Sequence, residues 1–160
     1  MGEPNHVALV PQTLLATLTR TPEPGTPAPS EARLEITVLF TSVEPTVAAL
    51  RRAGELASQL NGRITLVVPQ VVPYPLPLAS PPVARDFNER RFRVIAEESR
   101  AETTVQVYLC RDRYVTLESV LAERSLVVIG MRRRWWPTAE KRLIERLRKA
   151  GHEVVVTGTE

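Results

Sequence analysis

The sequence predicts an α/β domain built on a five-stranded parallel sheet with helices on both faces. Three observations support this fold class. Short apolar runs rich in β-branched residues, typical of strands buried on both faces, recur five times after residue 33. Segments with apolar residues at helical spacing separate these runs. The alternation of strand and helix requires crossover connections, which bury a parallel sheet between two helical layers.

The expected elements follow one another from residue 34 to residue 157. Strands are expected at Leu34–Phe40, Arg63–Val68, Thr103–Leu109, Ser125–Gly130 and Glu153–Thr157, the last of them buried. Helices are expected at Glu44–Leu60, Val83–Ser99, Thr116–Arg124 and from Pro137 to Ala150. Their inward-facing residues are expected to be Val47, Leu50, Ala53, Ala57, Leu60, Phe87, Phe92, Val94, Ile95, Leu117, Val120, Leu121, Leu143, Ile144, Leu147 and Ala150.

Residues 1–33 differ in composition from the domain at residues 34–160. Thr21–Ser30 contains four prolines in ten residues, which is typical of an extended linker. The apolar residues before it, at Val7–Val10 and Leu14–Leu18, either dock as a short strand and one helical turn or remain disordered; we expect docking. Pro69–Pro82 is a second proline-rich stretch. We interpret it as a surface connection outside the sheet, with a polyproline ligand as the alternative.

Composition limits the function classes. The chain has 160 residues, an ordinary apolar fraction of 43% and a net charge of only +3, so no nucleic-acid partner is expected. Positive charge gathers between Arg132 and Lys149. Cys110 is the single cysteine, which excludes an internal disulfide. No run is long enough for a membrane span and no signal peptide is evident, so a cytoplasmic location is expected.

The order of elements, with Glu44-Pro45 opening the first helix and with the strands Ile64–Val68 and Leu126–Gly130, resembles the universal stress protein family. The resemblance covers roughly residues 34–157. It implies a Rossmann-like stress-response module that acts without catalysis and forms homodimers. Relatives that bind ATP have an aspartate after the first strand. They also have a Gly-x2-Gly-x9-Gly-Ser/Thr loop after the fourth strand, which holds the phosphates on backbone amides.

This chain departs from both features. Thr41 stands at the aspartate position, and Gly130 fits the first glycine. Arg133 and Leu143 stand at the second and third glycines, and an arginine prevents the close backbone approach that a phosphate loop needs. We therefore expect a degenerate site without a cofactor, its crevice filled by cationic side chains; ATP or another nucleotide is the alternative. The candidate residues at the carboxyl ends of the strands are Thr41, Val68, Gly130, Arg132, Arg133 and Arg134.

Arg132–Trp136 is the motif most suggestive of function. Three guanidiniums beside two tryptophans could hold a phosphate or settle at a protein or lipid surface. The alternative is that a tryptophan packs beneath the loop and the arginines are solvated. Arg133–Trp136 followed by Val154–Thr157 also resembles the soluble C-terminal segment of some permeases of the amino acid-polyamine-organocation superfamily. That resemblance implies a regulator beside a membrane transporter.

The remaining candidates give no reason to predict an enzyme or a metal site. His6 and His152 lack partners at metal spacing, and no nucleophile-base set is recognisable. Cys110 is either a buried inert thiol or one activated by the neighbouring arginines. The last strand suggests a sheet edge, so Val154, Val155, Val156, Trp135 and Trp136 are the expected interface residues of a homodimer or of a contact with another protein.

Overall fold

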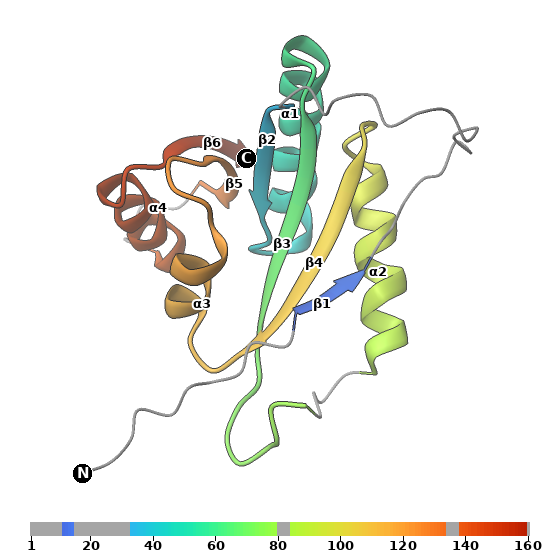
Figure 1. The fold of residues 1–160 in the computed structure, drawn as a ribbon, viewed down its shortest axis with the longest axis vertical. Helices are drawn as coiled ribbons and strands as arrows, with labels where there is room; N and C mark the ends of the chain where they lie inside the picture. The colour runs from blue at the N-terminus through green and yellow to red at the C-terminus, as the bar shows by residue number, and fades with distance from the viewer. Residues whose placement is uncertain (1–10, 15–32, 80–83, 134–137, 160) are drawn as a thin grey trace.

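The computed structural model describes residues 11–14, 33–79, 84–133 and 138–159. Within them, one sheet has the strand order β1-β4-β3-β2-β5-β6, and β2 to β6 are parallel (Figure 1). The strands are β1 (Pro11–Leu14), β2 (Glu35–Leu39), β3 (Arg63–Val71), β4 (Thr103–Cys110), β5 (Leu126–Arg132) and β6 (Glu153–Thr159). The helices are α1 (Val43–Leu60), α2 (Arg85–Glu97), α3 (Arg113–Val120) and α4 (Ala139–Lys149). The predicted fold class is confirmed.

Two hydrophobic layers hold the helices against the sheet. On one face α1 and α2 pack on the strands around Leu50, Leu66 and Phe92. On the other face α3 and α4 pack around Leu117 and Ile129. Figure 1 shows α2 at one side of the molecule and β5, β6 and α4 at the other. Because β2 lies between β3 and β5, the strand order reverses beside it, and this is where sheets of this kind usually bind ligands.

The structure corrects the prediction that proline keeps residues after Val68 out of the sheet. β3 continues through Pro69 to Val71, and Pro69 pairs in register with Tyr108 of β4. Phe40 donates its N–H to the carbonyl of Val67, so the odd-numbered residues of β3 direct their backbone N–H and C=O groups toward β2. The backbone nitrogen of Pro69 is on that side as well, but β2 has already ended at Leu39. No ladder hydrogen bond is lost there, and proline is tolerated.

A second correction concerns which residues face the core. Phe87 and Val94 are 61% and 63% exposed, because Phe92, Ile95 and Ala96 define the buried stripe of α2. Leu60 at the end of α1 is exposed, as is Ala150, which caps α4 beyond its buried turns. β6 is not buried either, because it pairs only with β5 and forms an edge of the sheet.

The N-terminal strand shows how part of the tail meets the domain. β1 pairs antiparallel with β4, from Pro11 opposite Tyr108 to Leu14 opposite Val105. The rest of the predicted docking segment and the linker lie outside the described residues. Within the described part of the chain, no helix has the length and apolar character needed to cross a membrane.

Candidate functional site

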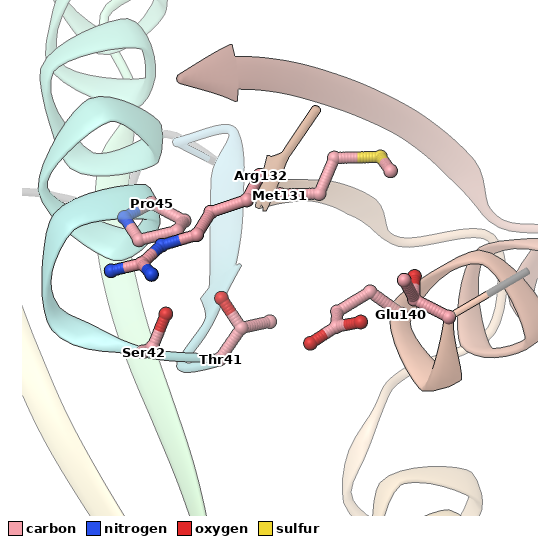
Figure 2. A pocket seen from close by; sticks show the side chains of 7 residues that line it. Thr41, Ser42, Pro45, Met131, Arg132 and Glu140 are labelled. Atoms are coloured by element: carbon pink, nitrogen blue, oxygen red, sulfur yellow. The ribbon is translucent and has the colours of Figure 1, made fainter. Parts of the chain in front are cut away.

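A cavity of about 260 Å³ lies at the carboxyl ends of β2 and β5, between the first turns of α1 and α4 (Figure 2). This is the position that the strand order favours for a ligand. The volume is below the roughly 300–1,000 Å³ of pockets that enclose drug-sized molecules. Its lining residues are Thr41, Ser42, Pro45, Met131, Arg132, Thr138 and Glu140.

The floor of the site depends on a close contact between β5 and α1. A Cβ atom at Gly130 would lie 1.8 Å from the carbonyl oxygen of Pro45, so only glycine fits between the strand and the helix. Thr41 reinforces the junction. Its hydroxyl donates to the carbonyl of Gly130 at 2.9 Å, and its N–H donates to the hydroxyl of Thr46 at 3.2 Å. At the position where the resemblance expects an aspartate, Thr41 therefore joins β2 to β5.

Arg132 forms one wall of the cavity. Its guanidinium donates to the carboxylate of Glu44 at 2.8 Å, and Figure 2 shows the side chain extended over Pro45. Both partners are more than half exposed, so the pair contributes about 0.2–1 kcal/mol to folding at most. The sequence predicts that arginines fill this crevice; Arg132 lies along its edge, and Arg134 lies outside the described residues.

Glu140 brings a second carboxylate to the cavity. It lies in the first turn of α4, where the helix dipole favours an acid, and it is half-buried. Figure 2 shows its carboxylate turned toward Thr41. Among the residues that the structure describes, Glu140 makes no ion pair and no side-chain hydrogen bond. The lining therefore carries one carboxylate, Glu140, and one guanidinium, Arg132, whose charge is offset by its ion pair with Glu44 outside the lining.

The backbone amide expected to face a phosphate is already used. The N–H of Arg133, which stands at the second glycine position, donates to the carbonyl of Thr159 at 3.3 Å. This bond arises because β5 continues to Arg132, two residues beyond its predicted end. Leu143, at the third glycine position, and Ile144 are buried in the core beneath α4. Of the two positions where the resemblance expects glycines, one has its amide bonded to Thr159 and the other has its side chain in the core.

The structure brings together only part of the predicted site. Thr41 and Arg132 line the cavity, with Gly130 at the junction beneath it. Val68 is buried within β3, and Arg133 is exposed after the end of β5; neither residue lines the cavity. Arg134, Trp135 and Trp136 lie outside the described residues. The lining residues not predicted from the sequence are Ser42, Pro45, Met131, Thr138 and Glu140.

Two of these residues, Thr138 and Glu140, belong to a pattern that the sequence alone shows. Thr138 caps α4 by accepting a hydrogen bond from the N–H of Lys141, and Glu140 follows two positions later. A capping residue followed by an acid marks the first turn of a helix. In this fold, a helix that follows a strand begins near that strand's carboxyl end, so the acid is placed at the site.

The outer edge of β6 carries two of the predicted interface residues, Val154 and Val156. The carbonyl of Thr159 bonds to Arg133 and the N–H of Glu153 bonds to Ser125, at the two ends of β5. The odd-numbered residues of β6, Val155 among them, therefore direct their backbone groups toward β5. Val154, Val156 and Gly158 alternate with them and direct their N–H and C=O groups outward. Their edge is paired with no strand that the structure describes.

Cys110 and His152 are held within the fold by burial and by a backbone hydrogen bond, respectively. Cys110 is buried, and this burial raises the pKa of its thiol despite the lowering effects of the Thr116 hydroxyl and the Arg113 charge. The environment matches the inert-thiol interpretation. The Nδ1 atom of His152 accepts a hydrogen bond from the N–H of Ser125. In the described ranges, no three His, Cys, Asp or Glu side chains gather closely enough to hold a metal ion.

Comparison with known proteins gives a match in fold. No family model and no curated protein matches the sequence. A universal stress protein from Archaeoglobus fulgidus aligns over 77% of this chain and 92% of its own, with a TM-score of 0.53 and 19% identity. A universal stress protein family member from Burkholderia pseudomallei aligns over 81% and 98%, with a TM-score of 0.52 and 20% identity. These two structures show that the chain has the fold of universal stress proteins.

Proposed function

We propose that this protein is a non-enzymatic regulatory module with the universal stress protein fold, that it acts through protein contacts, and that it does not bind ATP. The observation that carries the proposal is the chemistry of the cavity. Where a phosphate loop would offer bare amides, the Arg133 amide is bonded to Thr159, the Glu140 carboxylate lines the space, and Glu44 offsets the charge of Arg132. A polyphosphate would meet more negative than positive charge there.

The second part of the proposal is a homodimer that forms through the edge of β6. The outward N–H and C=O groups of Val156 and Gly158 offer a ladder that a second copy could join in antiparallel orientation. At Val154 the carbonyl already accepts a hydrogen bond from Arg148 at 3.5 Å, which a partner strand would displace. The opposite edge of the parallel strands is covered, because β1 pairs with β4. The two outer strands of the described sheet are β1 and β6, and β6 is the outer strand that belongs to the parallel set.

A calorimetric titration with Mg-ATP at moderate salt tests the first part. We expect no binding tighter than about 1 mM. The double variant Glu44→Gln/Glu140→Gln should gain affinity for ATP by about tenfold or more, because each nearby carboxylate costs a phosphate about 1–3 kcal/mol at an effective dielectric constant near 20. Micromolar binding by the wild-type protein would overturn the proposal.

Sedimentation of the wild-type protein tests the second part. We expect a dimer at micromolar concentration and a monomer for Val156→Pro. The N–H of Val156 points away from β5, so proline removes a donor needed by a partner strand and leaves the internal ladder complete. A wild-type protein that remains monomeric at micromolar concentration would remove the homodimer from the proposal.

A second candidate function is the binding of a small phosphate-bearing ligand through Arg132, which lines the cavity and can exchange Glu44 for another anion. Titration with inorganic phosphate distinguishes this function. It requires saturable binding that Arg132→Gln abolishes and Glu44→Gln strengthens. Absence of binding by both the wild type and Glu44→Gln would leave the interaction module as the function.

A further inference from the structure

A second cavity, which the proposed function does not use, lies at the opposite end of the sheet. It has a volume of about 470 Å³ and is lined by residues of α1, of β5 and β6, and of the segments that precede β2 and β5. Its apolar lining is Leu34, Leu56, Leu60, Leu126 and Val155. We call this cavity the aliphatic groove. Leu60 is 52% exposed, so the groove presents apolar surface to solvent.

The rim of the aliphatic groove is acidic. Glu35, Glu123 and Glu153 surround it, with Arg124 as the one basic lining residue. Neither Glu123 nor Glu153 forms an ion pair with any residue in the described ranges. Glu35 is paired with Arg63 at 3.7 Å, so the excess negative charge of the rim comes from Glu123 and Glu153. The groove therefore favours an occupant with apolar and basic side chains on one face.

The outer face of α2 has that character. Phe87 and Val94 are seven residues apart, and both are largely exposed. Arg90 and Arg91 lie between them on the same stripe and are also exposed. We call these four residues the α2 stripe. Exposed apolar side chains two turns apart, with cations between them, are unusual on a helix that faces only water.

We propose that the α2 stripe of one copy of this chain docks in the aliphatic groove of a second copy. The two surfaces match in chemistry. Phe87 and Val94 present apolar side chains two helical turns apart to the aliphatic lining. Arg90 and Arg91 between them carry the charge that complements Glu123 and Glu153 of the rim.

The two surfaces cannot meet within one chain. Figure 1 shows α2 on one side of the molecule and β5 and β6 on the other. The contact therefore joins two different surfaces on two copies, so each copy retains one unused groove and one unused stripe. Such a heterologous contact adds further copies and forms either a closed ring or an open chain of copies. It is independent of a dimer formed through the edge of β6.

Sedimentation in the Val156→Pro background tests this contact apart from the β6 edge. We expect that parent protein to form larger species as its concentration rises toward millimolar. Leu60→Glu, in the groove, and Val94→Glu, in the stripe, should each weaken self-association about tenfold or more, because each places a carboxylate at the centre of an apolar contact. An equimolar mixture of the two variants should form a 1:1 complex, since one retains the groove and the other the stripe.

Val115→Glu provides the matched control, because Val115 on α3 is 63% exposed, as is Val94, and belongs to neither surface. This variant should associate like its parent. The proposal is overturned if the parent stays monomeric up to millimolar concentration, which would leave the groove to a different partner. It is also overturned if the two variants associate normally alone, or if their mixture forms no complex.

Discussion

Replacing Gly130 by alanine tests the junction on which the cavity is built. The added Cβ would lie 1.8 Å from the carbonyl oxygen of Pro45 and 2.3 Å from its carbonyl carbon, and both are backbone atoms that cannot rotate away. The start of α1 must therefore move off β5. Such a movement also strains the hydrogen bond from Thr41 to the Gly130 carbonyl.

We expect the Gly130→Ala variant to lose about 3 kcal/mol of unfolding free energy, the upper part of the range for forced overpacking. For a chain of this length, that loss corresponds to a decrease in Tm of about 6–12 °C. Urea denaturation followed by circular dichroism at equilibrium measures the change directly. The midpoint should fall with little change in slope, because the unfolded chain is the same.

Gly158→Ala is the matched control. Gly158 lies in the neighbouring strand β6, and a Cβ atom built there meets nothing within 4 Å. Alanine at this position should be neutral or stabilising by up to about 1 kcal/mol, since it restricts the unfolded chain. If Gly130→Ala unfolds within about 0.5 kcal/mol of the wild type, the tight contact between β5 and α1 is wrong.

Two further predictions concern α3 and the strand before it. Asp112 accepts hydrogen bonds from the N–H groups of Tyr114 and Val115 and so caps α3. Asp112→Ala should lower the free energy of unfolding by about 1 kcal/mol, and Asp112→Asn should lower it less, as measured by thermal unfolding. Equal losses for the two variants would contradict the capping role. Burial raises the pKa of the Cys110 thiol in the folded state, so its contribution to stability is present below pH 9 and declines as pH rises above that ordinary value. Urea titrations between pH 8 and 10.5 should show a steeper decline for the wild type than for Cys110→Ala, and parallel curves would refute the assignment.

Buried apolar patterns were reliable guides to the elements. The continuous aliphatic runs at β2, β3 and β5 are buried on both faces, as predicted. Helical spacing was a less reliable guide to which residues are buried when the apolar residues of a helix formed two stripes. In α2, Phe87 and Val94 are as apolar as Phe92 and Ile95, but only the second pair faces the sheet. Composition cannot decide between two such stripes, because the choice depends on where the sheet lies.

Proline was a second source of error. The sequence shows that Pro69 lacks a donor, and this excludes a central strand position flanked by neighbours on both sides. It does not show that β2 ends at Leu39, two positions before the ladder would need that donor. The length of a neighbouring strand is a property of the assembled sheet. For the same reason, β5 extends to Arg132 because β6 accompanies it that far.

The candidate site shows the same division. The sequence by itself determined which residues stand at the counted positions, with Thr41 where the resemblance expects an aspartate and Arg133 and Leu143 where it expects glycines. Only the tertiary structure placed Glu140 and Arg132 around one cavity, committed the Arg133 amide to Thr159 and put Gly130 against Pro45. Each of these contacts joins residues from separate elements, and their distances follow from how those elements pack and not from local preference.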